Sequence, residues 1–237
     1  MNILVVCQYY YPEPFRITDI CETLVDKGHR VTVLTGLPNY PEGVVPLEYK
    51  KKGKRNEQIN GVKVIRCFEI GRGRSRLKLV QNYISFTLSA TLKAIRLKNE
   101  FDCVFVYQLS PVMMGIPAIV YKNKSKKKMA LYCLDLWPDS LMAVGIRQDT
   151  LIYKIIHKLS RWIYNSADTL LISSTMFADY FDDILKLSKP VKHLPQYAED
   201  IYTQTTSISH EASASHIDKK FHFVFAGNIG ELQSIDT

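Results

Sequence analysis

Short apolar, β-branched runs alternate with amphipathic segments along most of this chain, and this alternation constrains its fold more than any other feature. Residues 3–7 form such a run, and apolar residues at positions 17, 20, 21, 24 and 25 then recur at helical spacing. Lys27-Gly28 ends that helix, because a cation suits the last turn and a glycine suits the left-handed conformation after it. A second strand follows at residues 31–34. This order predicts a βαβ unit with a right-handed crossover.

The same alternation continues to about residue 194. We expect further strands at 62–65, 103–106, 129–134, 169–172 and 191–194, and helices at 77–98, 112–122, 151–164 and 176–187. Runs that are apolar on both faces are typical of parallel strands covered by helices on both sides. The sequence therefore predicts an α/β fold, a doubly wound, Rossmann-like domain with a parallel sheet, over residues 1–198.

The residues after this domain have a different composition. Residues 203–215 are rich in Ser, Thr and Ala, so we assign 199–219 to a linker. Residues 221–225 form another strand-like run, which leads into a glycine-rich loop. Because one strand forms no core by itself, we expect 220–237 to be the truncated start of a second domain.

The positive charge of the chain is concentrated in clusters. The formal charge is +8, which favours anionic partners such as phosphates, nucleic acid or acidic lipid headgroups. Three segments, 50–55, 72–78 and 122–128, hold 14 of the 31 Lys and Arg residues. The alternative for each segment is an ordinary solvated loop. A nucleic-acid-binding α/β protein ranks low, because the sequence lacks base-stacking and helix-turn-helix signatures.

Cysteine usage and hydropathy indicate a cytoplasmic location. The five cysteines are scattered, and none forms a CxxC or a ligand-spaced pair with a histidine, which argues against a zinc site. Reduced thiols fit the cytoplasm. The chain opens on a strand-like run rather than a signal peptide. No apolar stretch approaches the roughly 18 residues that a membrane-spanning helix needs.

The loops at the expected carboxyl ends of the strands suggest the kind of ligand. Neither G-x-G-x-x-G after the first strand nor G-x-x-x-x-G-K-[ST] is present, so a dehydrogenase or a P-loop nucleotidase has little support. Loops 8–16, 36–43, 107–111 and 135–140 supply tyrosines, prolines, amides and a few acids. Ligands collect at this edge of a doubly wound sheet, and such side chains suit carbohydrate. The alternative is that tyrosine and proline only make the loops rigid.

Five segments carry a resemblance to a known family: QYYYPEPFR at 8–16, LPNYPEG at 37–43, DLWPDS at 135–140, LPQYAED at 194–200 and FAGNIG at 225–230. The first three resemble the N-terminal domain of a family-4 retaining glycosyltransferase with the GT-B fold. The fourth resembles the family's crossing into its second domain, and the fifth resembles its first glycine-rich loop. They occur in the family's order and extend over the whole chain. The subgroup that they resemble builds bacterial capsule, O-antigen and exopolysaccharide units.

The resemblance implies an activity and its partners. The donor would be a nucleotide sugar, most simply a UDP-sugar, transferred with retention and without a metal or other cofactor. The acceptor would be a saccharide on a polyprenyl diphosphate, at the anionic inner face of the plasma membrane. The family's E-x7-E donor carboxylates lie beyond residue 237, so we expect this chain to be inactive alone. The alternative is an acceptor-binding subunit that needs a separate donor-domain partner.

The same motifs give candidate site residues. We assign Asp135 as catalytic, Arg16, Asn39, Tyr40 and Trp137 as acceptor-binding, and Gly227, Asn228 and Gly230 as donor phosphate-binding. Glycines let backbone N–H groups approach a diphosphate. Asp135 follows an apolar strand, where a carboxylate needs a partner. Its alternative role is to cap the helical turn that starts at Trp137-Pro138.

The expected helix at 77–98 has an apolar stripe with Arg and Lys on its flanks. The stripe consists of Leu77, Val80, Ile84, Leu88 and Leu92. We expect it to pack on the sheet. The alternative is contact with anionic lipid.

Overall fold

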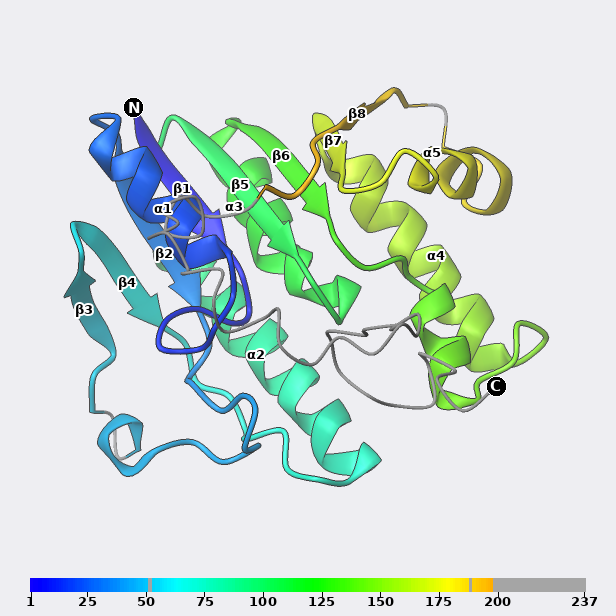
Figure 1. Ribbon diagram of the computed structural model, residues 1–237, viewed down its shortest axis with the longest axis horizontal. Coiled ribbons are helices and arrows are strands. Elements are labelled where there is room, and N and C mark those ends of the chain that lie inside the picture. Colours follow the sequence, from blue (N-terminus) through cyan, green and yellow to red (C-terminus); the bar gives the residue numbers. More distant parts are fainter. Residues whose placement is uncertain (51–52, 188, 198–237) are drawn as a thin grey trace, which may run out of the picture. The chain divides into compact units, whose positions relative to one another are not determined.

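The computed structural model describes residues 1–50, 53–187 and 189–197, and the compact unit to which almost all of them belong runs from Met1 to Gln196. Its sheet has eight strands in the order β3-β4-β2-β1-β5-β6-β7-β8 (Figure 1). The strands are β1 (Asn2–Val6), β2 (Arg30–Thr35), β3 (Asn56–Ile59), β4 (Val62–Arg66), β5 (Cys103–Gln108), β6 (Lys128–Cys133), β7 (Thr169–Ile172) and β8 (Val191–His193). The helices are α1 (Ile17–Asp26), α2 (Arg76–Arg96), α3 (Ile116–Ser125), α4 (Leu151–Ser166) and the short α5 (Phe177–Asp179).

The strands pair in parallel except for β3 and β4, which are antiparallel. Strand β1 lies in the middle, where Val5 pairs with Val33 of β2 and with Phe105 of β5. Helix α1 covers one face of the sheet, and α2, α3 and α4 pack side by side on the other (Figure 1). This arrangement follows from right-handed crossovers that run outward from β1 in both directions. The predicted doubly wound α/β fold is confirmed.

The core explains why the strands read as continuous apolar runs. Leu4, Val5 and Val6 are fully buried, because helices cover both faces of β1. All five cysteines are free thiols, and four of them are buried. Burial raises the pKa of the Cys7 thiol to about 12, so this side chain serves as a small apolar group.

Three local elements differ from the sequence prediction. A β3–β4 hairpin was missed; its turn, Asn60-Gly61, has both φ angles positive, at 45° and 82°, as the twist of a tight hairpin requires. Helix α3 starts only at Ile116, after a 3₁₀ turn over Val112–Gly115, so that Pro117 lies in its first turn, where a missing N–H costs nothing. The predicted helix at 176–187 is the short α5 followed by a π-helix over Tyr180–Ile184.

The expected packing of helix α2 was wrong. The stripe predicted to face the sheet points to solvent: Leu77 is 69% exposed, Leu88 61% and Leu92 54%. The opposite side is buried, through Asn82, Phe86, Thr87, Ala90 and Ala94. Small side chains at positions 90 and 94 let the helix lie close to the sheet, and the Asn82 amide finds buried partners. Of the helices in the described residues, none combines the length and the hydrophobicity that a membrane crossing requires.

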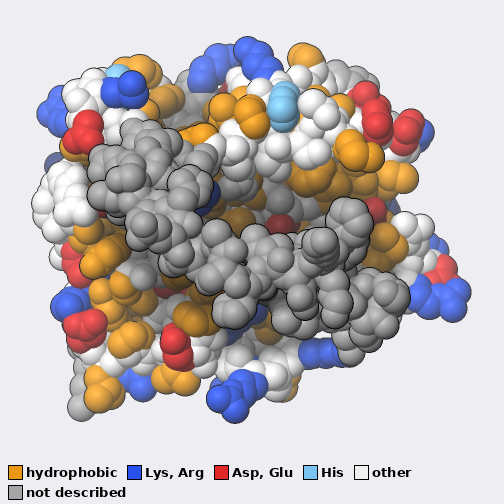
Figure 2. Space-filling model, viewed as in Figure 1, with side chains coloured by type: hydrophobic (Ala, Val, Ile, Leu, Met, Phe, Trp, Pro, Cys, Tyr) orange, Lys and Arg blue, Asp and Glu red, His pale blue; other side chains and the backbone are white. Residues whose placement is uncertain are grey.

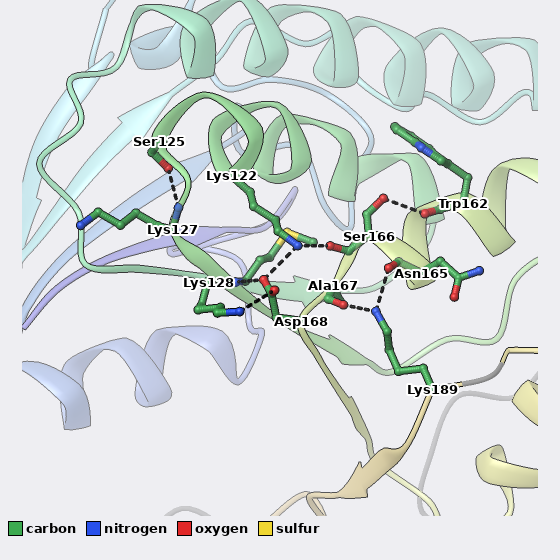
Figure 3. Close-up of polar contacts among 11 residues, drawn as sticks. Lys122, Ser125, Lys127, Lys128, Trp162, Asn165, Ser166, Ala167, Asp168 and Lys189 are labelled. Atoms are coloured by element: carbon green, nitrogen blue, oxygen red, sulfur yellow. Dashed lines mark hydrogen bonds and ion pairs between the residues drawn. The ribbon is translucent and has the colours of Figure 1, made fainter.

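The third basic segment, 122–128, largely serves the fold (Figure 3). Lys122 Nζ donates to Ser166 O at the end of α4 over 2.6 Å and lies 2.9 Å from Asp168 Oδ2. Lys124 Nζ donates to Ile95 O at the end of α2 over 2.7 Å. These lysines satisfy helix C-terminal carbonyls and complement the helix dipoles, so they are more than solvated charges.

Charged side chains are unevenly distributed over the surface. In the face that Figure 2 shows, Lys and Arg side chains stand mainly at the margins, whereas hydrophobic side chains reach the surface nearer the middle. Independently of this view, six exposed apolar side chains of the molecule belong to α2, namely Leu77, Val80, Ile84, Leu88, Leu92 and Ile95.

Candidate functional site

The order of the strands reverses between β1 and β5, and this switch point is where doubly wound sheets bind ligands. The loops after β1 and β2 and the segment after β4 meet on one side of it. The loops after β5 and β6 meet on the other. Each side holds a connected group of polar and aromatic residues.

An aromatic platform forms where the loops after β1 and β2 touch. The ring of Phe15 lies 5.1 Å from that of Tyr9 and 5.2 Å from that of Tyr40, measured between centroids. The guanidinium of Arg72, from the segment after β4, stands over the Tyr40 ring at 5.2 Å. Sugar rings stack on aromatic faces through their C–H groups, and a guanidinium binds phosphate oxygens. The platform can therefore serve both parts of a saccharide diphosphate.

Glu13 joins the two loops under the platform. Its Oε1 accepts from the backbone N–H groups of Asn39 over 2.9 Å and of Tyr40 over 2.8 Å, and its Oε2 accepts from Tyr10 N over 3.2 Å. Burial raises the pKa of the Glu13 carboxyl to about 6, although these three hydrogen bonds and the Arg66 charge lower it. Its role is to fix the positions of Tyr10, Asn39 and Tyr40.

Asn39 belongs to a second buried network. Its Nδ2 donates to Glu69 Oε1 and to Leu37 O, and its Oδ1 accepts from Arg72 N over 3.0 Å. Gln8 Nε2 donates to Glu69 Oε2 over 3.3 Å and to Asn82 Oδ1 of α2 over 2.8 Å. Burial raises the pKa of the Glu69 carboxyl well above its usual range, and the nearby Glu13 charge adds to this. Asn39 is 2% exposed, so its amide serves to hold the loop after β2 against the segment after β4.

Gly36 makes room for this network. A Cβ atom at Gly36 would lie 2.2 Å from Glu69 Oε2 and 2.9 Å from the Gln8 carbonyl oxygen. The Gly36 N–H also donates to that carbonyl over 2.9 Å. The buried carboxylate can approach the loop after β2 only because this position lacks a side chain.

On the other side of the switch point, Asp135 is part of a hydrogen-bonded chain. Its Oδ2 accepts from Ser110 Oγ over 2.8 Å, and Ser110 Oγ accepts from Trp137 Nε1 over 3.0 Å. The Asp135 backbone oxygen accepts from Gln108 Nε2 and Tyr164 Oη. The helical turn that follows spans Asp139–Val144, has Pro138 at its N-cap and has no side-chain cap. The alternative capping role of Asp135 is therefore not seen.

Two tyrosines connect the halves of the site electrostatically. Burial raises the pKa of Tyr83 on α2, while the Arg72 charge lowers it and the Asp135 charge raises it. Burial also raises the pKa of Tyr132 on β6, and the Arg16 charge lowers it. The Arg72 and Asp135 charges thus act on the pKa of one phenol in opposite directions.

The structure places the predicted site residues in two groups. Arg16, Asn39 and Tyr40 belong to the loops after β1 and β2, and Asp135 and Trp137 belong to the loop after β6. Gly227, Asn228 and Gly230, the linker and the second domain lie outside the described residues. Sequence reasoning missed four residues that organise the site: Glu13, Glu69, Arg72 and Ser110. Glu13 and Ser110 lay inside loops already singled out, and Arg72 lay in the second basic segment, but Glu69 carried no comparable signal.

The arrangement offers carboxylate, guanidinium, hydroxyl and aromatic groups but no metal centre. Within the described part of the chain, no group of three His, Cys, Asp or Glu side chains is arranged to hold a metal ion. Asp139, in the turn after Asp135, accepts from the Tyr153 hydroxyl of α4. This contact ties the loop after β6 to the helix layer.

Comparison with known families identifies the domain. Residues 15–192 match the glycosyl transferase 4-like domain. The chain belongs to this family. The match runs from the end of the loop after β1 into β8, and so includes the loops of the candidate site that follow β2, β5 and β6. No curated protein sequence matches the chain significantly.

Solved structures show the same fold in glycosyltransferase-type proteins. Sucrose-phosphate synthase from Thermosynechococcus elongatus superposes with a TM-score of 0.56 at 13% identity, over 84% of this chain and 48% of that one. A shorter chain of the same enzyme superposes with a TM-score of 0.53 at 14% identity, over 84% of this chain and 91% of that one. This chain therefore spans about half the length of the longer relative. The described unit has the Rossmann-like fold of GT-B glycosyltransferases.

Proposed function

We propose that this protein transfers a hexosyl or N-acetylhexosaminyl group from a nucleotide sugar to a saccharide on a polyprenyl diphosphate, in the synthesis of a bacterial surface polysaccharide. The described unit would bind the acceptor. The observation that supports this most is the chain of hydrogen bonds from Trp137 through Ser110 to Asp135 at the switch point. It holds a half-buried carboxylate on one side of the switch point, while the aromatic and cationic platform lies on the other, in a chain of the glycosyl transferase 4-like family.

In this proposal the residues divide into contacts and supports. Asp135 would accept a hydrogen bond from a hydroxyl of the acceptor or donor, and Ser110 would orient it. Tyr40 would supply an apolar face, and Arg16 and Arg72 would attract the diphosphate. Trp137 is 7% exposed, so it would act through its hydrogen bond to Ser110 rather than by direct contact. Asn39 and Glu13 would act as positioning residues, because their polar atoms are engaged inside the protein.

The donor side remains a proposal from the sequence. Gly227, Asn228 and Gly230 would bring backbone N–H groups to the diphosphate of a UDP-sugar. We propose no metal ion for the reaction, since backbone amides and cationic side chains can stabilise a leaving diphosphate. The protein would work at the inner face of the plasma membrane, where its acceptor is held.

A transfer assay on the full-length protein tests the proposal. Radiolabelled UDP-sugars would be offered with polyprenyl diphosphate-linked N-acetylglucosamine, and labelled lipid-linked product would be measured. Asp135→Asn keeps the size of the side chain, so we expect transfer to fall by about 10²-fold while the melting temperature changes little. Asp149→Asn, at an exposed carboxylate on the loop before α4, is the matched control and should leave transfer unchanged. Normal transfer by Asp135→Asn would refute the proposed role of Asp135, and no transfer with any UDP-sugar would refute the proposed function.

A further inference from the structure

The outer face of helix α2 is an apolar stripe that the described residues leave uncovered. It runs the length of the 21-residue helix and consists of Leu77, Val80, Ile84, Leu88, Leu92 and Ile95. Each of these side chains is between 46% and 69% exposed. The spacing of three and four residues puts all six on one side of the helix. A continuous apolar face of this length on a surface helix marks an interaction site.

The charges around this stripe are all of one sign. Between Glu69 and Glu100 the sequence contains no acidic residue, and it contains seven cations: Arg72, Arg74, Arg76, Lys78, Lys93, Arg96 and Lys98. Arg76 and Lys78 are in the first turn of α2, while Arg96 ends the helix and Lys98 follows it. An apolar helix face with cations on its flanks is the pattern of helices that lie in the interface of an anionic bilayer.

A basic pocket of about 280 Å³ adjoins the C-terminal half of the stripe. Its lining includes Leu92 of the stripe, Ser89, Lys93 and Arg96 from α2, and Arg55 and Arg66 from the β3–β4 hairpin region. Arg66 is 4% exposed, and it is held by Glu57 through Nε and by Tyr11 O through Nη2, over 2.6 Å. The pocket thus combines Arg55, Lys93 and Arg96 with the edge of an apolar surface, whereas the Arg66 side chain is fully buried and paired with Glu57.

Arg55, which lines this pocket, carries a buried guanidinium nitrogen atom that lacks a protein acceptor. The Nη1 atom of Arg55 has no hydrogen-bond partner among the described residues. A buried donor on a charged group is costly when it is unsatisfied, and phosphate oxygens are its strongest natural acceptors. The pocket is therefore suited to an anion with several oxygen atoms.

We propose that the outer face of α2 docks on an anionic phospholipid bilayer, and that the basic pocket receives the phosphate of a lipid headgroup. The inference deepens the proposed function and rests on it only for the view that the acceptor is lipid-linked. Leu88 and its neighbours would enter the headgroup boundary, while Arg96 and Lys98 at one end and Arg76 and Lys78 at the other would contact lipid phosphates.

A bilayer fits this surface better than a second copy of the chain does. A symmetric dimer through α2 would bring the same seven cations of each protomer together, and like charges facing each other oppose association. An anionic bilayer instead supplies the opposite charge along the whole helix.

Cosedimentation of the 237-residue chain with vesicles tests the inference. We expect binding to phosphatidylcholine vesicles that contain phosphatidylglycerol, weaker binding at high salt, and little binding to phosphatidylcholine alone. Leu88→Glu should lower binding about tenfold or more, because it places a carboxylate in the stripe. Leu151→Glu, at an exposed leucine of α4, is the matched control and should bind normally.

Pocket variants separate lipid phosphate from free phosphate. Arg55→Gln and Arg96→Gln should each lower binding to phosphatidylglycerol vesicles about fivefold. Inorganic phosphate at equal concentration should compete poorly, because it gains nothing from the apolar stripe. Equal binding to neutral vesicles, equal loss in Leu151→Glu, efficient competition by inorganic phosphate, or a dimer abolished by Leu88→Glu would each overturn the inference.

The two proposals can fail separately. If the full-length protein used in the transfer assay transfers sugar to a short-chain, water-soluble acceptor but does not bind phosphatidylglycerol vesicles, the docking surface is refuted and the proposed function stands. If it binds these vesicles through α2 but transfers no sugar to any acceptor, the proposed function is refuted and the docking surface stands.

Discussion

The indole Nε1 of Trp137 donates to the hydroxyl oxygen of Ser110 over 3.0 Å, and this contact sets the direction of the hydrogen bonds at the candidate site. An indole N–H can only donate, so the single hydroxyl proton of Ser110 is left for Asp135 Oδ2, 2.8 Å away. Two loops on neighbouring strands, β5 and β6, are joined in this way. Asp135 is held as an acceptor at the edge where ligands bind.

Removal of the Ser110 hydroxyl should lower the stability of the fold. Ser110→Ala leaves a partly buried indole N–H and a carboxylate oxygen without their partner, which we expect to cost about 1–3 kcal/mol of unfolding free energy. Ser140→Ala is a suitable control, because Ser140 Oγ donates only to a local backbone oxygen, Leu136 O. Its cost should be about 1 kcal/mol or less. Chemical denaturation measures both values, and equal losses would contradict the linking role of Ser110.

Glu13 should make the stability of the chain depend on pH. Its folded pKa of about 6 lies above its ordinary value of 4.5, so the folded state holds the proton more tightly. The resulting stabilisation is present below pH 4.5 and is lost as the pH rises to 6, by about 2 kcal/mol. Glu13→Gln should remove this part of the pH slope, whereas Glu42→Gln, at an exposed carboxylate of the next loop, should keep it. Denaturation at pH 4.5 and pH 6 measures this change in unfolding free energy. The same change in the wild type and in Glu13→Gln would show that the prediction is wrong.

The two lysines that pair with Asp168 should contribute unequally to the stability of the fold. Lys122 and Lys128 both pair with Asp168, but the Lys122 side chain is 22% exposed and the Lys128 side chain 86%. Burial raises the pKa of Asp168, yet hydrogen bonds from Lys122, Met129 N and Lys128 outweigh it and bring the value to about 2. Lys122→Met should therefore cost about 2 kcal/mol at neutral pH, and Lys128→Met less than about 0.5 kcal/mol. A similar loss in both variants would contradict this account.

The Asp168 contribution also has a pH signature. The folded pKa lies below the ordinary value of 3.8, so the stabilisation is complete above about pH 4 and disappears as the pH falls toward 2. Lys122→Met should flatten the stability profile in this acid range. A profile with the same acid slope as the wild type would show that Lys122 does not hold the carboxylate.

The hairpin turn offers a test with a matched glycine. Gly61 has φ +82° and a Cβ there would lie 2.7 Å from Val25 Cγ1, whereas Gly28 has φ +83° and open space around it. Gly28→Ala should lower the unfolding free energy only by the backbone strain, about 1–2 kcal/mol. Gly61→Ala should lower the unfolding free energy by about 1 kcal/mol more, because the Val25 side chain must move. Equal unfolding free energies for the two variants would refute the contact.

Hydrophobic patterns were sufficient to predict the order of the parallel strands and the main helices, but neither the short strand β3 nor the orientation of α2. Periodicity shows which residues share a side of a helix, and it placed Leu77, Ile84 and Leu88 together. It does not show which side faces the sheet. The buried side contains Asn82, whose amide reaches Gln8 and Ile70, and such tertiary partners are invisible along the sequence.

The sequence indicated which loops form the candidate site, but not which side chains in them contact one another. Asp135, Trp137 and Tyr40 were proposed because their segments resemble a family and follow strands. Ser110 was passed over because a single serine before a proline has no distinctive pattern. Glu69 reads as one acid in a charged stretch, and only the packing of β4 against the loop after β2 shows that it is buried beside Gly36.

The most direct test of the account is a titration of isotope-labelled chain, followed by amide NMR, with farnesyl diphosphate-linked N-acetylglucosamine as the soluble acceptor probe. The account predicts saturable shifts that cluster in residues 8–16, 37–43, 109–111 and 135–139, and about tenfold weaker binding by Asp135→Asn with its fold intact. The same shifts in Asp135→Asn at equal affinity, or shifts confined to other surfaces, would contradict the claim that the switch point binds a saccharide.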